Sequence, residues 1–183
     1  MKSSEDLREK RRNLEEQLKE IELKPSSSYG FSDEEGKRAT EKAMSLLAYK
    51  DRTRKELEER LYRAGFSEKA SEEAVSYAEH YGYINDRRYV ETYIMFQQGK
   101  RSRKEITYKL VEKGIARDLI REVFLEADYE GEEEAVERLL PKKLKGRSVS
   151  ELSYEERQKV MAYFRRKGFD LNCVKNVFYK LDI

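Results

Sequence analysis

Three glycines that separate pairs of helical patterns recur along this chain, at Gly65, Gly114 and Gly168, with spacings of 49 and 54 residues. Ahead of each one, a Ser or Thr is followed three residues later by Glu. In such a capping box, the hydroxyl and the carboxylate each satisfy a free backbone donor at a helix start. Glycine takes the positive φ that ends a helix without steric cost. These shared signals indicate an internal repeat, so the fold must accommodate one unit three times.

Each copy reads as two short helices joined at its glycine. In the first copy, Leu57 and Leu61 stack one turn apart ahead of the glycine. Phe66 then returns the chain to the apolar face, and Ser67 caps the second helix. The capping pairs and apolar positions that correspond between the copies are Thr53–Glu56 with Leu57, Leu61 and Phe66; Ser102–Glu105 with Ile106, Leu110 and Ile115; and Ser153–Glu156 with Val160, Phe164 and Phe169.

A further helix precedes each pair. Ser32 and Glu35 form the capping box of the first, Asp86 caps the second, and Gly131 opens the third, which Pro141 ends. No stretch shows the alternation of a β-strand. We therefore predict an all-α fold, an elongated array of three tandem three-helix repeats with an N-terminal helical extension. The predicted domains are a charged helix and Pro/Ser linker over 1–31, and repeats over 32–85, 86–130 and 131–183.

Two details concern the edges of this array. In the N-terminal region, Leu7, Leu14 and Ile21 recur every seven residues within a charged helix over 3–24, which suits a surface helix or self-association. Between the first two repeats, Tyr83 and Ile84 are expected to fill the joint. The four tyrosines at helix ends and apolar positions there are expected to pack rather than to bind a ligand; they are Tyr81, Tyr83, Tyr89 and Tyr93.

Strings in this frame resemble the RecX regulatory family. They are AMSLLAYKDRTRKELEERLYRAGF and YGYINDRRYV in the first repeat, KEITYKLVEKGI in the second and KVMAYFRRKGF in the third. The resemblance covers residues 43–181. It implies a non-enzymatic, cytoplasmic modulator that binds the RecA recombinase and its filament on single-stranded DNA, and that mostly inhibits recombinase and co-protease activity in DNA repair and the SOS response. The loop after Pro141 and the arm before Ser32 depart most from the family pattern.

Few residues could carry catalysis or hold a metal. His80 and Cys173 are the only histidine and cysteine, which excludes a zinc finger or a thiol–imidazole dyad within the chain. His80 is expected at a helix end near Tyr81, and Cys173 occupies an apolar position, where a free cysteine behaves as a small hydrophobe. No phosphate-binding glycine loop is present. We expect no enzymatic activity, no cofactor and no metal.

Charge is segregated locally, although the net charge is only +2 and 42% of residues are charged against 38% hydrophobic. Basic groups recur near the same inter-helix loop of each repeat, whereas residues 126–137 hold acids and no base. A one-sided basic track binds a phosphate backbone or an acidic protein surface. The predicted contact residues for RecA or DNA are Arg52, Arg54, Lys55, Lys100, Arg101, Arg103, Lys104, Lys142, Lys143, Lys145, Arg147, Arg165, Arg166 and Lys167.

Two other functions fit parts of the pattern. Three-helix units with basic loops superficially suit helix-turn-helix docking, as in a DNA-binding transcription or nucleoid factor. Against that reading, the helix SEKASEEAVSYAEH is acidic. A helical adaptor that binds only protein is the third possibility. We expect a monomer whose binding to single-stranded DNA is weak and salt-dependent. No apolar run reaches the length of a membrane span or follows Met1 as in a signal peptide.

Overall fold

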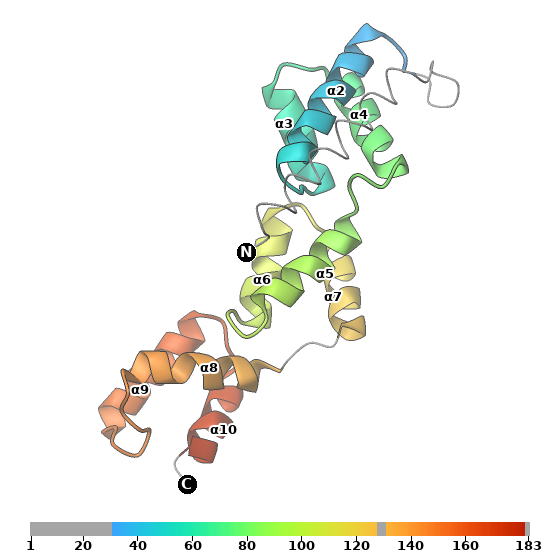
Figure 1. Ribbon diagram of the computed structural model, residues 1–183. Helices are drawn as coiled ribbons and strands as arrows, with labels where there is room; N and C mark the ends of the chain where they lie inside the picture. Colours follow the sequence, from blue (N-terminus) through green and yellow to red (C-terminus); the bar gives the residue numbers. More distant parts are fainter. Residues whose placement is uncertain (1–30, 128–130, 182–183) are drawn as a thin grey trace. The chain divides into compact units, whose positions relative to one another are not determined.

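The computed structural model describes residues 31–127 and 131–181, and within them it contains nine α-helices and no strand (Figure 1). The helices are α2 (Glu34–Tyr49), α3 (Arg54–Arg63), α4 (Glu68–His80), α5 (Asp86–Gln97), α6 (Arg103–Glu112), α7 (Arg117–Glu126), α8 (Glu132–Leu144), α9 (Tyr154–Arg166) and α10 (Leu171–Leu181). The all-α prediction of tandem three-helix repeats is confirmed. The helix predicted over 3–24 lies outside the described residues, and the repeat boundaries stay predictions.

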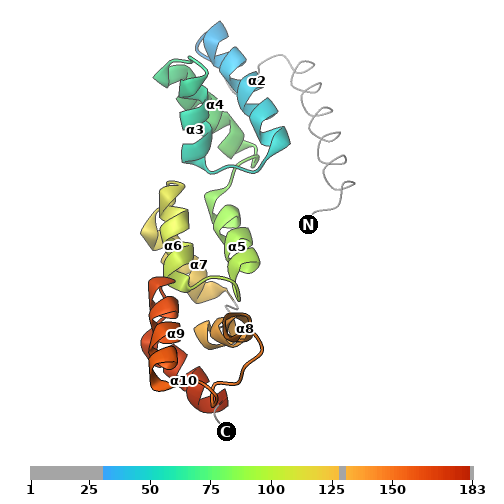
Figure 2. The same ribbon diagram turned by 90° about the vertical axis from the view of Figure 1, so that its left-hand side faces the viewer.

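The chain divides into two compact units, and the division falls within α5, between Tyr89 and Val90. In the first unit, α2 packs along α4, and α3 closes the bundle (Figure 2). Leu57 and Leu61 are fully buried in its core, as predicted from their spacing. Ile84 is also buried there, with 4% of its surface exposed. The turn after α4 therefore contributes to the core of the first unit.

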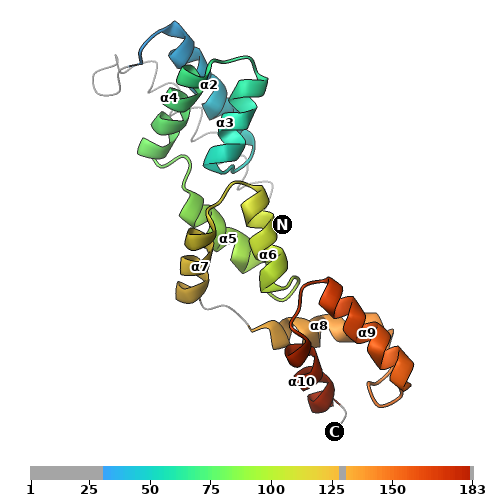
Figure 3. The ribbon, with the colours of Figure 1, turned by 180° about the vertical axis from the view of Figure 1, so that it is seen from behind.

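The second unit holds most of α5, together with α6 to α10. In the third repeat, α10 packs against both α8 and α9 (Figure 3). Phe164 and Phe169 meet edge to face at 5.5 Å in its core, where Val160 is buried as well. Cys173 lies partly buried against the same cluster. The apolar positions predicted from the repeat are therefore the ones that build this core.

Most of the signals that defined the repeat act as predicted. Thr53–Glu56 and Ser153–Glu156 form complete capping boxes at the starts of α3 and α9. The three glycines take φ values of 91°, 86° and 86° in the order Gly65, Gly114 and Gly168. These values lie in the region that favours glycine, because a β-carbon there approaches the following carbonyl oxygen.

Three capping predictions are wrong by one residue or one bond. The N-cap of α2 is Asp33 rather than Ser32, while Glu35 accepts hydrogen bonds from the backbone and side chain of Ser67. Asn85, rather than Asp86, caps α5 by accepting from the backbone of Arg88 at 2.9 Å. At α6, Ser102 accepts from the backbone of Glu105, but the Glu105 carboxylate pairs with Arg101 instead of closing the box. In each case a tertiary or neighbouring donor competes for the carboxylate.

Pro141 does not end its helix, contrary to the sequence prediction. It lies inside α8, which continues to Leu144 and ends at Lys145 in the left-handed conformation, with a φ of 54°. A proline in a helix costs a backbone hydrogen bond. Leu140 and Leu144, one turn apart, are both buried in the core of the third repeat, and their burial offsets that cost.

The tyrosines between the first two repeats differ in burial. Tyr83, Tyr89 and Tyr93 are half-buried, in line with a packing role. Tyr81 keeps 46% of its surface exposed, although its ring lies 4.6 Å from that of Tyr77. His80 is the last residue of α4 and meets Tyr81 edge to face at 4.8 Å, as expected of a helix-end residue.

Candidate functional site: a basic surface on the second unit

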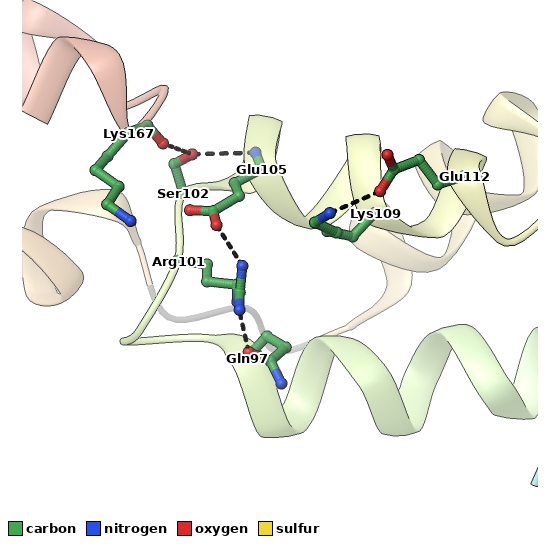
Figure 4. A network of polar contacts seen from close by, with 7 residues as sticks. All are labelled: Gln97, Arg101, Ser102, Glu105, Lys109, Glu112 and Lys167. Carbon is green, nitrogen blue, oxygen red and sulfur yellow. Dashed lines mark hydrogen bonds and ion pairs between the residues drawn. The ribbon is translucent and has the colours of Figure 1, made fainter.

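Ser102 ties the loop between α5 and α6 to the end of α9. Its hydroxyl donates to the backbone carbonyl of Lys167 at 2.8 Å and accepts from the backbone N–H of Glu105 at 3.1 Å (Figure 4). Ser102 is fully buried, so both bonds are shielded from water. Gly168, the residue after Lys167, packs its backbone against the side chain of Lys104. The contact therefore brings two of the predicted basic groups together.

Glu132 makes a second connection between the same repeats. One carboxylate oxygen accepts from the backbone N–H of Arg103 at 2.8 Å, and the other accepts from that of Asp170 at 3.3 Å. Both donors stand at helix starts, where backbone N–H groups lack intrahelical partners and the helix dipole favours a negative charge. Ser102 and Glu132 together form what we call the repeat joint. They fix the Lys100–Lys104 segment beside the Arg165–Lys167 segment.

The structural roles of Ser102 and Glu132 in the repeat joint were missed from the sequence. A related contact in the first unit shows which sequence signal could have predicted the role of Glu132: an acidic residue at the start of a repeat. There, Asp86 at the start of α5 accepts from the backbone N–H of Arg54 at 2.9 Å. Burial raises the pKa of Asp86, and the hydrogen bond from Arg54 opposes this effect. An acid at the start of one repeat thus binds the first N–H of the second helix in the preceding repeat.

Several arginines of the predicted track are already occupied by carboxylates. Arg101 pairs with Glu105 and also donates from Nε to Gln97 at 2.9 Å (Figure 4). Arg147 donates to Glu156 at 2.8 Å. The guanidinium of Arg103 lies 4.6 Å from the ring centre of Phe124, a cation–π contact. These side chains brace the loops more than they offer charge to a ligand.

Other cations of the track keep their charge available. They are exposed or half-exposed, and the described part of the chain shows no carboxylate within ion-pair distance of them; they are Lys100, Lys104, Lys142, Lys145, Arg165, Arg166 and Lys167. Lys143 lies over the ring of Tyr163, with its Nζ 4.5 Å from the centroid. Tyr163 is one turn ahead of Arg166 and Lys167 on α9. Lys143 thus connects α8 to α9, and we call the cations of α8, α9 and the α5–α6 loop the basic surface of the second unit.

The fourth basic group belongs to the first unit and offers less free charge. Arg54 pairs with Glu79, and Arg52 is half-buried. Lys55 is exposed and lies 3.9 Å from a carboxylate oxygen of Glu59, a pairing worth little at a protein surface. The basic group of the first unit therefore offers fewer unpaired cations than the groups of the second unit.

Acidic, histidine and cysteine side chains are the remaining candidates for chemistry. Among residues 31–127 and 131–181, no three acidic, histidine or cysteine side chains are placed to hold a metal ion. Burial and the nearby carboxylates of Glu132 and Glu133 raise the pKa of Cys173 to about 12, so its thiol stays protonated at neutral pH. No helix in the same described segments is long and apolar enough to cross a membrane.

Comparison with known proteins identifies both repeats of the N-terminal two thirds. Residues 39–77 match the family model described as RecX, first three-helix domain, and residues 85–123 match RecX, second three-helix domain. Each range includes a hinge glycine and its capping pair. The third repeat lies outside these two matches.

Relatives and solved structures point the same way. The chain is 35% identical over 144 residues to the regulatory protein RecX of Caldanaerobacter subterraneus subsp. tengcongensis, covering 77% of this chain and 69% of that protein. It is 29% identical to the RecX of Clostridium perfringens strain 13, where the match spans 71% of this chain and only 62% of the relative. The crystal structure of RecX from Lactobacillus salivarius aligns with a TM-score of 0.69 at 25% identity, over 81% of this chain and 97% of that one.

Proposed function

The chain belongs to the RecX family of regulatory proteins, and on that premise we propose that it binds the RecA recombinase and its filaments on single-stranded DNA. Binding restrains the recombinase and co-protease activities of RecA during DNA repair and the SOS response. The protein acts by occupying the filament and catalyses no reaction of its own. It works as a monomer in the cytoplasm.

The observation that carries this proposal is the basic surface of the second unit. The repeat joint holds Lys104 and Lys167 close together, and neither has a carboxylate partner in the described segments. Unpaired surface cations gain by releasing the counterions that condense on a phosphate backbone. They also favour an acidic protein surface, and they raise the rate of encounter with a negatively charged partner. A nucleoprotein filament offers both kinds of surface.

RecA-driven strand exchange tests the proposal through a pair of matched variants. The first is Lys104→Glu with Lys167→Glu, which reverses charge on both sides of the repeat joint. The side chain of Lys167 is changed while its carbonyl, the acceptor of Ser102, remains. The control is Lys159→Glu with Lys175→Glu, two exposed lysines of the third repeat that are not among the predicted contact residues. Both variants alter the net charge equally.

We expect the wild-type protein and the control variant to inhibit strand exchange. The variant Lys104→Glu with Lys167→Glu should lose most of that inhibition. Exposed charges contribute little to folding, so the stability of both variants should stay within about 0.5 kcal/mol of wild type. No inhibition by the wild-type protein would refute the proposed function. Equal inhibition by all three proteins would instead show that the basic surface plays no part in the proposed function.

A further inference from the structure

Two exposed aromatic side chains bracket the α5–α6 loop. Phe96 stands four residues before Lys100, with 47% of its surface exposed. Tyr108 stands four residues after Lys104, with 59% exposed. Helical residues four apart lie on the same face, about 5–6 Å from each other. Tyr108 is therefore one turn from Lys104 on α6, whereas Lys100 lies in the turn after α5; neither lysine has a carboxylate partner among the described residues.

Side-chain contacts hold these groups in place. The Lys100 ammonium donates to the carbonyl of Phe96 at 2.9 Å, which keeps the cation over the end of α5. On α6, the Lys109 ammonium donates to Glu112 at 2.7 Å (Figure 4). It also lies 5.5 Å from the ring centre of Tyr108. Hydrogen bonds from Lys109 and Tyr108 lower the pKa of Glu112. The ring of Tyr108 stays exposed beside this ion pair.

Other exposed aromatics in the second unit lie in acidic surroundings. Tyr179 precedes Lys180, whose ammonium is bound by Glu133 at 2.8 Å and lies 3.5 Å from Glu137. Tyr154 opens α9, and two glutamates follow it in the first turn of that helix. A negatively charged ligand is disfavoured at both positions. The pair around the α5–α6 loop differs in that both rings stand near cations of the basic surface, Lys100 and Lys104.

We propose that this bracketed loop is a binding site for single-stranded nucleic acid, in which bases stack on Phe96 and Tyr108 while phosphates lie at Lys100, Lys104 and Lys167. Proteins that bind single strands combine a cationic path for the backbone with aromatic platforms for the bases. The site rests on the proposed function for its setting, a filament on single-stranded DNA. Its chemistry is independent of RecA, because both kinds of contact are made to the nucleic acid itself.

Binding of the full chain to a fluorescent oligothymidylate, followed by anisotropy at several salt concentrations, separates the two kinds of contact. Stacking on one ring is lost in Tyr108→Ala, so the affinity should fall about tenfold while the salt slope stays unchanged. The same result is expected for Phe96→Ala. Lys104→Ala should instead reduce the salt slope by about 0.7, the value for one phosphate contact on a single strand.

Two control variants test whether a loss of affinity comes from misfolding or from the removal of any exposed tyrosine. Tyr108→Phe keeps the ring and should bind as wild type does. Tyr179→Ala removes a tyrosine that is more exposed, 72% against 59%, and that lies outside the proposed site, so it should also leave binding unchanged. The proposal is overturned if Tyr108→Ala binds the oligonucleotide normally, or if the Phe variant loses as much affinity as the Ala variant.

The outcomes also separate this site from the proposed function. If the wild-type protein fails to bind the oligonucleotide at low salt but still inhibits RecA, the nucleic-acid site is refuted and the family function stands. If Tyr108→Ala keeps its DNA affinity but loses inhibition of RecA, the loop is a protein-docking surface, which also refutes the site. Normal DNA binding without any effect on RecA would refute only the proposed function.

Discussion

Replacing Gly168 by alanine should damage the protein more than the same change at Gly65, although both glycines end equivalent helices. Their φ values are 86° and 91°, so the backbone strain on the new side chain is almost the same. The surroundings differ. A β-carbon at Gly65 would meet nothing within 4 Å, whereas one at Gly168 would lie 2.8 Å from the Ser102 hydroxyl and 3.3 Å from Cβ of Lys104.

The expected magnitudes follow from these contacts. Positive φ costs a residue with a β-carbon roughly 1–2 kcal/mol, part of which is offset because alanine stiffens the unfolded chain by about 0.4–1 kcal/mol. Gly65→Ala should therefore destabilise the first unit by about 1 kcal/mol. At Gly168, the Ser102 hydroxyl must also move away from its two hydrogen bonds, each worth about 1 kcal/mol. Gly168→Ala should cost about 3 kcal/mol in the second unit.

Native-state hydrogen exchange is the suitable assay, because two units need not unfold together and a single melting curve would mix them. The protection of backbone amides from exchange should fall in α6, α9 and α10 for Gly168→Ala, and in α3 and α4 for Gly65→Ala. In a Ser102→Ala background the hydroxyl is absent, so the extra cost of Gly168→Ala should largely disappear. Equal destabilisation by the two glycine variants, or an unchanged cost in that background, would refute the clash as the cause.

Three further predictions concern single groups. Ile84→Ala should destabilise the first unit by roughly 2–4 kcal/mol in the same exchange assay, because the side chain is buried in that core; a loss below 1 kcal/mol would contradict this. The raised pKa of Asp86 means that its contribution to stability is present at low pH and lost as the pH rises through that pKa. Asp86→Asn should keep an acceptor for Arg54, remove this pH dependence and be no less stable at pH 7, whereas Asp86→Ala should lose about 1 kcal/mol. Cys173, with a pKa of about 12, should react with iodoacetamide at pH 8 far more slowly than free cysteine until the protein unfolds; fast labelling of the native protein would argue against burial as the cause.

Much of the fold could be predicted because its signals are local. A capping box such as Thr53–Glu56, two leucines one turn apart and a glycine at the helix end all act within about a dozen residues. Where a carboxylate had a choice of donors, the sequence was insufficient. Glu35 binds Ser67, 32 residues away, and Asp86 binds Arg54, so neither closes or caps its own helix as expected. Pro141 shows the same limit, because only the packed core reveals why its helix continues.

The candidate site was predictable in composition but not in assembly. Clusters of lysine and arginine are visible in the sequence, and the pairing of Arg101 with Glu105 could have been read from their spacing of four residues. The bond between Ser102 and Lys167 spans 65 residues and gives no local signal. It determines which cations lie together, and tertiary pairs such as Arg147 with Glu156 determine which of them stay available.

The repeat joint gives this arrangement a physical role. Because Glu132 holds the starts of α6 and α10, and Ser102 holds the end of α9, the basic groups of two repeats keep a fixed spacing. A fixed array of cations loses less side-chain freedom on binding than one that must assemble on its ligand. We therefore expect Glu132→Ala to weaken filament binding even though Glu132 itself carries the wrong charge for a polyanion.

The affinity of the full chain for RecA filaments on single-stranded DNA, measured between about 50 and 200 mM salt, tests the role of the basic surface most directly. For the wild-type protein, we predict an affinity that falls steeply as salt rises. Lys104→Glu with Lys167→Glu should bind at least roughly tenfold more weakly at the lowest salt, with a shallower salt dependence, while Lys159→Glu with Lys175→Glu should follow the wild type. Three superimposable salt titrations would contradict the proposal that the cations at the repeat joint face the filament.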